Sequence, residues 1–211
     1  ALAPGGTVIL SPGINAALTT RIAAYGRLSG KAVVSATLGR RVGPVANTAQ
    51  GARFSYGLTA PEEVQDWTVQ LHLAGKHQVE NAVTAVRAAE TWFGARPQQH
   101  DPHLAKILEA VGKARWPGRL ELVARAPDLW IDVGHTPRAL DAVTSTFQEF
   151  CPRDKTLVVF GVSASKDVAR ISDVVASRFD HFILTQARKS GADPGVFAET
   201  FRTRSQDVTV E

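Results

Sequence analysis

Residues 129–140 have the sequence LWIDVGHTPRAL. A short apolar run ends at Asp132, a small turn carrying His135 follows, and the pattern after Pro137 predicts a helix. In open α/β sheets, ligands bind beyond the carboxyl ends of the strands. An acid and an imidazole in such a turn therefore predict a binding site.

The same alternation continues on both sides of this unit. Strands are predicted over 119–126, 129–133, 156–162, 181–186 and 207–210, and helices over 137–150, 167–178 and 193–204. Alternating strands and helices predict a mostly parallel sheet covered by helices. We therefore expect a Rossmann-like α/β domain here, in which the Trp-Ile pair before Asp132 is buried.

The first half of the chain has a different pattern. Strands are predicted over 7–10 and 31–36, and helices over 14–28, 81–93 and 101–111. Residues 40–73 contain short strand-like runs separated by Gly and Pro turns, which predict an antiparallel ribbon. The stretch WPGR at 116–119 ends the helical pattern, so we predict two domains, 1–115 and 116–211. Because Pro fixes one torsion and Gly frees the next, WPGR also predicts a hinge.

The composition excludes several classes of protein. With 211 residues, 44% of them hydrophobic, the chain can bury a core, which argues against disorder. No run approaches the ~18 to 20 apolar residues that cross a membrane, and the N-terminus lacks the features of a signal peptide. A single cysteine, Cys151, excludes an internal disulfide. We expect a cytoplasmic protein with no membrane partner.

The charge favours small anionic ligands over nucleic acid. The net charge is +4, but the 24 basic residues are interspersed with 20 acidic ones and form no run of four. Such a surface suits nucleotides, and no nucleic-acid partner is expected. The six histidines show no paired spacing for a metal site. The chain has no methionine and begins ALAPGG, from which we expect a piece of a longer protein.

Two polar residues in the 129–140 stretch are candidates for a site. The Asp132 carboxylate could hold a ribose hydroxyl or a cation at the end of its strand. Alternatively, Asp132 caps the helix that starts at Pro137, or closes a turn. His135 could donate to a carboxylate or phosphate, or act as an acid or base near neutral pH; alternatively, it is a surface group.

Other candidates lie elsewhere in the chain. Arg119 could bind phosphate across a cleft between the domains, or be an ordinary surface arginine. Asn81 could cap its helix or bind an adenine edge. Ser163 and Lys166 precede a predicted helix N-terminus, which favours anions. The chain lacks the Gly-x-x-x-x-Gly-Lys-Ser/Thr phosphate loop.

Five motifs follow one another in a single order. They are LAGKHQVENAVTAV (73–86), WPGRLELV (116–123), LWIDVGHTPRAL (129–140), LVVFGVSASKDV (157–168) and FILTQARKS (182–190). In this order they resemble the Mur-ligase superfamily, specifically folylpolyglutamate synthase and dihydrofolate synthase, over roughly positions 70 to 190. The resemblance implies the C-terminal part of a central ATPase domain in 1–115 and a C-terminal domain in 116–211.

The resemblance also implies a reaction. ATP would phosphorylate a folate or pteroate carboxylate, and the amine of L-glutamate would attack the acyl phosphate to form an amide. By resemblance, Asn81, Arg119 and Asp132 would bind ATP. His135 would be catalytic, near the phosphate and the glutamate. Substrate would also contact Ser163 and Lys166.

The chain departs from the family in several places. Thr136 stands where the family has Asn, and Val133-Gly134 replaces Gly-Ala. There is no Glu/His pair of the kind that would hold magnesium, so the Mg²⁺ ligands are expected outside this chain. The chain alone is predicted to be inactive because it lacks the phosphate-binding loop. A monomer is expected. Two alternatives stay open: a relative that joins another acid and amino acid, or a non-catalytic remnant that binds nucleotide or a partner.

Overall fold

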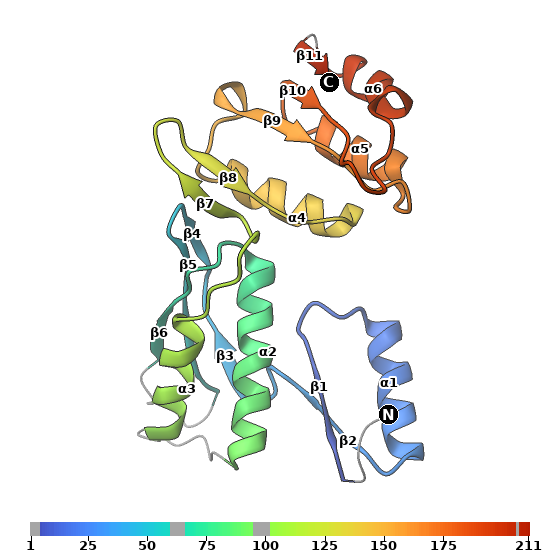
Figure 1. The fold of residues 1–211 in the computed structure, drawn as a ribbon. Coiled ribbons are helices and arrows are strands. Elements are labelled where there is room, and N and C mark those ends of the chain that lie inside the picture. Colours follow the sequence, from blue (N-terminus) through green and yellow to red (C-terminus); the bar gives the residue numbers. More distant parts are fainter. Residues whose placement is uncertain (1–4, 60–65, 95–101, 206) are drawn as a thin grey trace. The chain divides into compact units, whose positions relative to one another are not determined.

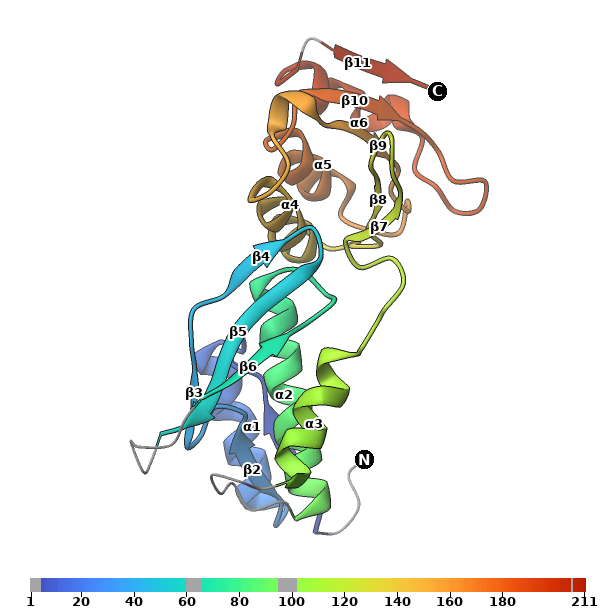
Figure 2. The same ribbon diagram turned by 90° about the vertical axis from the view of Figure 1, so that its left-hand side faces the viewer.

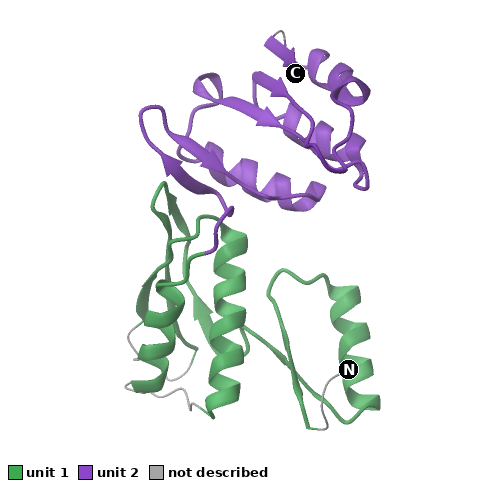
Figure 3. Ribbon diagram, viewed as in Figure 1, with its two compact units in different colours: residues 1–115 green, residues 116–211 purple. Residues whose placement is uncertain are grey.

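The computed structural model describes residues 5–59, 66–94, 102–205 and 207–211. It divides into two compact units, Ala1–Arg115 and Trp116–Glu211, which are coloured separately in Figure 3. Figure 1 labels the helices and strands of each unit. Within the described residues, no helix is both long enough and apolar enough to cross a bilayer.

The first unit begins with a β-α-β motif. Strands β1 (Thr7–Leu10) and β2 (Ala32–Ser35) pair in parallel, and α1 (Ala16–Leu28) connects them. The Asn15 side chain starts α1 by accepting a hydrogen bond from the Leu18 N–H at 2.8 Å. Gly26 brings the helix close to β2, because a Cβ there would lie 2.3 Å from Val33 Cγ2.

An antiparallel ribbon follows, as predicted. It consists of β3 (Arg40–Val42), β4 (Ala46–Thr48), β5 (Gly51–Leu58) and β6 (Trp67–Gln70). Both β3 and β4 pair with one edge of β5, one after the other, and β6 pairs with the opposite edge (Figure 2). Phe54, Tyr56 and Leu58 alternate along β5 and are all buried, so one face of the ribbon enters the core.

Helices α2 (Lys76–Phe93) and α3 (Pro102–Gly112) contribute the other side of this core. The predicted start of α2 at Asn81 is wrong, because the helix begins five residues earlier, after Gly75. Gly75 has φ +111°, and its N–H donates to Asn47 Oδ1 at 2.8 Å. Asn81 is therefore inside the helix and is not its N-cap. Asp101, where the second helix was expected to start, lies outside the described residues.

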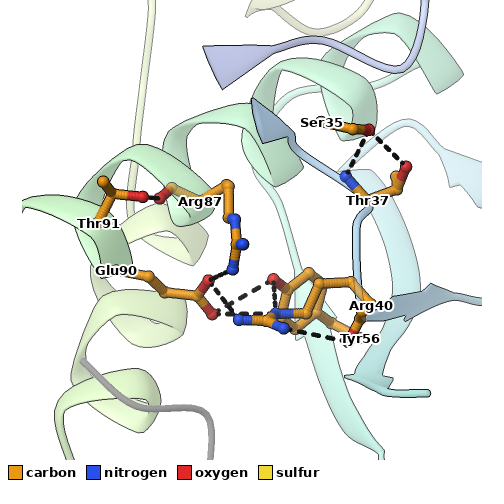
Figure 4. Close-up of polar contacts among 8 residues, drawn as sticks. Ser35, Thr37, Arg40, Tyr56, Arg87, Glu90 and Thr91 are labelled. Atoms are coloured by element: carbon orange, nitrogen blue, oxygen red, sulfur yellow. Dashed lines mark hydrogen bonds and ion pairs between the residues drawn. The ribbon is translucent and has the colours of Figure 1, made fainter. Parts of the chain in front are cut away.

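A buried polar network connects the ribbon to α2 (Figure 4). Arg40 Nη2 on β3 donates to Glu90 Oε2 on α2 at 2.7 Å, and Arg40 Nε donates to the Tyr56 hydroxyl at 3.1 Å. Arg87 Nη1 donates to the same carboxylate at 3.2 Å. Burial alone would lower the pKa of Arg40, but the hydrogen bond and charge of Glu90 raise it above its ordinary value. Burial raises the pKa of Tyr56 to about 12, and the Glu90 charge acts in the same direction.

The second unit contains the predicted parallel sheet. Strands β9 (Leu157–Phe160), β10 (His181–Leu184) and β11 (Asp207–Val210) are parallel in the order β11-β10-β9. The α-helices of this unit are α4 (Pro137–Gln148), α5 (Val168–Ala176) and α6 (Pro194–Arg202), and a short 3-10 helix, η1, spans Arg153–Lys155. A core rich in phenylalanine forms between the helices and the inward face of the sheet.

Strands β7 (Glu121–Ala124) and β8 (Leu129–Ile131) form an antiparallel hairpin, a pairing that the βα alternation did not predict. Strands joined by a short connection pair antiparallel, whereas parallel strands need a long crossover. The expected burial of the Trp-Ile pair holds only in part. The ring of Trp130 packs against Phe147 and Phe150. Ile131 is on the outer face of the hairpin, with 44% of its surface exposed.

Candidate functional site

The turn before β7 holds Arg119 between two residues with left-handed backbone. Gly118 has φ +71° and Leu120 has φ +45°. A Cβ on Gly118 would lie 2.9 Å from Val133 Cγ1, so this position favours glycine for its torsion and for its contact. A left-handed leucine is uncommon and requires specific support. Burial of its side chain, which is 9% exposed, provides part of that support.

Three hydrogen bonds fix this turn within the second unit. The Gly118 N–H donates to Glu121 Oε2 at 2.7 Å, and the Leu120 N–H donates to Asp132 Oδ2 at 2.9 Å. The Val133 N–H donates to the Gly118 carbonyl at 2.9 Å. The segments before and after the β7–β8 hairpin are therefore joined. Gly118, which the sequence suggested as part of a hinge, is tied to the hairpin.

Asp132 has a local structural role. Its Oδ1 accepts from the Gly134 N–H at 2.6 Å, in addition to the bond from Leu120 to Oδ2. Of the alternatives open from the sequence, Asp132 closes a turn but does not cap α4. That cap is Thr136, whose hydroxyl accepts from the Ala139 N–H at 3.2 Å. A contact between Asp132 and nucleotide stays a prediction.

His135 extends from the same loop into solvent. Its Nδ1 is 3.1 Å from the Val133 carbonyl oxygen. A carbonyl can only accept, so Nδ1 carries a proton and donates. In the neutral ring, Nε2 is then the atom that can accept a proton. This arrangement gives a base or a hydrogen-bond acceptor close to the Arg119 turn in the fold.

Arg119 is half-buried, and its guanidinium has no hydrogen-bond or ion-pair partner among the described residues. Both carboxylates that hold its turn, Glu121 and Asp132, accept backbone N–H groups instead. The cation therefore remains available for a ligand. Planar guanidinium groups bind phosphate or carboxylate with two parallel hydrogen bonds.

Ser163 and Lys166 follow β9 in an exposed loop. Ser163 pairs with Gly191 through an isolated bridge, and its hydroxyl is 3.0 Å from that of Ser165. Asp167 caps α5, since its carboxylate accepts from the Arg170 N–H at 3.2 Å. The helix N-terminus thus already has an anionic partner in Asp167, so Lys166 would supply the charge for a substrate. A contact of Ser163 and Lys166 with substrate stays a prediction.

Asn81 belongs to the first unit, on an exposed part of α2. Its Nδ2 donates to Gln78 Oε1 at 3.2 Å. A cavity of about 230 Å³ in this unit is lined by other residues. They are Pro12, Thr37, Val42, Gly43, Val45, Lys76, Val79, Glu80 and Val83. Across the parts of the chain that the structure describes, no three His, Cys, Asp or Glu side chains are grouped to hold a metal ion.

The sequence interpretation missed two residues of this site. Glu121 was assigned only to a strand, and Thr136 was noted only as a departure from a family motif. A signal for Glu121 was present: a glutamate three residues after a turn glycine can reach back to its N–H, as in a capping box. A signal for Thr136 was also present, because threonine directly before proline is a common helix start.

Comparison with known protein families gives a match to the second unit. Residues 118–211 match the family model described as Mur ligase, glutamate ligase domain. The match covers less than half of the chain and lies in the second unit. This match agrees with the order of the motifs in the second half of the chain and with the α/β fold of the second unit.

Among similar proteins, a dihydrofolate synthase/folylpolyglutamate synthase of Mycobacterium tuberculosis is 32% identical over 117 residues, covering 56% of this chain and 24% of that protein. A UDP-N-acetylmuramoyl-L-alanyl-D-glutamate–2,6-diaminopimelate ligase of Chlamydia abortus is 32% identical over 126 residues, covering 58% and 25%. The matches therefore span about a quarter of the length of these relatives.

A solved structure has the same fold over nearly the whole chain. It is the Mycobacterium tuberculosis folylpolyglutamate synthase complexed with ADP, with a TM-score of 0.79 and 22% identity. The match covers 97% of this chain and 44% of that one. Both units of this chain, and not only the second, are therefore similar in fold to the matched part of that synthase.

Proposed function

We propose that this chain is part of an ATP-dependent ligase that adds L-glutamate to a folate or pteroate carboxylate. Similarity to folylpolyglutamate synthases supports the reaction class. The observation that carries the proposal is the Arg119 turn: its guanidinium has no partner among the described residues, and its backbone is fixed by two carboxylates. The Arg119 guanidinium can thus bind an anionic ligand. We propose that this ligand is the phosphates of ATP.

The proposed reaction has two steps. A carboxylate oxygen of the acid attacks the γ-phosphorus of ATP, and ADP leaves. The glutamate nitrogen then attacks the acyl carbon, and inorganic phosphate leaves as the amide forms. Arg119 offsets negative charge that develops on the transferred group. His135 Nε2 accepts the proton that the attacking amine loses, because its Nδ1 proton is engaged with Val133.

Other residues take binding roles in this proposal. Asn81 and Asp132 are further nucleotide contacts in this proposal. Ser163 and Lys166 bind the carboxylates of a substrate. The proposal includes Mg²⁺, but the described residues do not form a metal site, and its ligands are expected outside this chain. We therefore assign no step of the reaction to the metal.

The test is a ligation assay with the natural protein that carries this sequence. ATP, L-glutamate and dihydropteroate or tetrahydrofolate are supplied, and the products are analysed by mass spectrometry. One glutamyl addition per ADP formed supports the proposal. Arg119→Ala and His135→Ala should both reduce the rate, with His135→Ala leaving ADP affinity within a factor of about two, since it removes a proton acceptor rather than a phosphate contact. ADP formation without a glutamylated product would contradict it.

Similarity to diaminopimelate ligases favours a second candidate, in which another acid and another amino acid are joined. The loop that would contact the amino acid carries Thr136 where folylpolyglutamate synthases have Asn, and the Thr136 hydroxyl is engaged in capping α4. A fold and a nucleotide site do not fix the substrate. Supplying diaminopimelate in place of glutamate in the same assay, with a UDP-linked peptide acceptor, distinguishes the two.

A further inference from the structure

Glu121 lies outside the residues assigned so far to ligand contacts, yet it holds the turn that carries Arg119. It is the first residue of β7, and its Oε2 accepts the Gly118 N–H at 2.7 Å. A hydrogen bond to an ionised acceptor is shorter and stronger than one between neutral groups. Glu121 therefore fixes the backbone one residue before Arg119.

The opposite side of Arg119 is fixed in the same way. The Leu120 N–H donates to Asp132 Oδ2 at 2.9 Å. Both neighbours of Arg119 have positive φ, +71° at Gly118 and +45° at Leu120. A left-handed non-glycine residue is strained, and it persists only where its surroundings impose it. Two carboxylates impose it here, one on each side of Arg119.

The charges give this arrangement a chemical consequence. A carboxylate beside an arginine would ordinarily form an ion pair with it, and the guanidinium would then be engaged. Glu121 directs its carboxylate to the Gly118 N–H, and no ion pair between Glu121 and Arg119 is present in the described part of the chain. The same side chain thus orients the arginine and leaves its cation available.

We propose that Glu121 is a positioning residue for Arg119, acting through the Gly118 N–H. This inference rests on the proposed function only in taking the ligand of Arg119 to be the nucleotide. Glu121 itself touches no substrate. Its effect on nucleotide binding therefore passes entirely through Arg119, and this makes it separable from a general effect on folding.

The test measures ADP affinity for wild type and four variants of the natural protein that carries this sequence: Glu121→Ala, Glu121→Gln, Arg119→Ala and the double variant Arg119→Ala/Glu121→Ala. Glu121→Ala is expected to weaken ADP binding about fivefold to tenfold, and Arg119→Ala at least tenfold, as the loss of a charge-assisted contact implies. Glu121→Gln should restore most of the affinity, because its amide oxygen can still accept from Gly118. The double variant should bind no more weakly than Arg119→Ala, because coupled residues are not additive.

Two outcomes overturn the inference. One is an equal loss from Glu121→Ala with and without Arg119, which indicates a merely structural role. The other is an unchanged ADP affinity in Glu121→Ala while Arg119→Ala weakens ADP binding. If Arg119→Ala itself leaves ADP affinity unchanged, the proposed nucleotide contact fails instead. Amide hydrogen exchange in the 211-residue chain then tests whether Glu121 positions Arg119. Faster exchange at both Gly118 and Leu120 in Glu121→Ala supports positioning of Arg119, and a change at Gly118 alone contradicts it.

Discussion

Arg40 and Glu90 form an ion pair inside the first unit, with 2.7 Å between Nη2 and Oε2 and side chains only 4% and 3% exposed. One residue is on the ribbon and the other on α2, fifty positions later. Breaking a buried pair leaves an uncompensated charge away from water, which is far more costly than the pair itself is stabilising. The packing of α2 on the ribbon therefore depends on this contact.

Glu90→Ala is expected to lower the free energy of unfolding of the first unit by about 3 to 5 kcal/mol, because Arg40 stays buried without its partner. Urea unfolding measures the loss. Glu109→Ala is the matched control: its partner Lys113 and Glu109 are 72% and 63% exposed. An exposed pair contributes far less than a buried one costs to break, because water screens its charges. Equal losses of unfolding free energy in the two variants would show that the buried pair contributes no more to stability than the exposed pair.

The raised pKa of Tyr56 predicts a loss of stability at alkaline pH. Its pKa in the folded protein is about 12, against an ordinary value of 10.0. Between these pH values the unfolded chain has released the Tyr56 proton while the folded protein retains it. The contribution of Tyr56 to the free energy of unfolding is therefore fully present below pH 10 and is lost toward pH 12.

Tyrosinate absorbance measures this ionisation. The chain has two tyrosines, so in a Tyr25→Phe background Tyr56 is the only one that reports. The expected midpoint is about 12 for the folded protein. A midpoint near 10.0, the ordinary value, would contradict the buried environment of the hydroxyl.

Asp132→Ala is expected to destabilise the second unit by about 1 to 3 kcal/mol, since two backbone N–H groups lose a charged acceptor. Asp132→Asn should lose less, because one oxygen remains. Amide exchange at Leu120 and Gly134 measures the local effect. Asp128→Ala is the control, as Asp128 forms an exposed pair with Arg125 at 3.6 Å. Unchanged exchange in Asp132→Ala would leave nucleotide contact as the only role for this residue.

The 211-residue chain alone is expected to hydrolyse ATP far more slowly than ~1 s⁻¹, the low end for enzymes, since its sequence contains no Gly-x-x-x-x-Gly-Lys-Ser/Thr loop. A phosphate-release assay measures the rate, with heat-denatured chain as the control. Turnover near that value would mean that another part of the chain binds the phosphates.

The sequence predicted the fold class well, because each half of the chain has a clear periodicity. The strand-like runs of residues 40–73 and the βα repeats from Pro137 onward both appear in the structure. The start of α2 was less predictable. Asn81 looked like an N-cap, whereas the helix follows Gly75, whose N–H is bound by Asn47 from the ribbon. A tertiary contact of this kind leaves no local pattern.

The candidate site was predicted as a set of residues but not as a set of contacts. Asp132, His135 and Arg119 were identified from their motifs. The sequence did not indicate that both oxygens of Asp132 accept backbone N–H groups, or that β7 and β8 form a hairpin. These facts depend on how residues before and after the hairpin meet, which the order of motifs does not determine.

The two hydrophobic cores have no residue in common: one contains Tyr56 and Val86, the other Phe182 and Phe201. A chain with two cores need not unfold in a single cooperative step. One melting temperature then describes neither core, and calorimetry of the intact chain is best fitted with two transitions. A variant that opens only the first core, such as Glu90→Ala, would expose that half to proteolysis while Trp116–Glu211 remains as a resistant fragment.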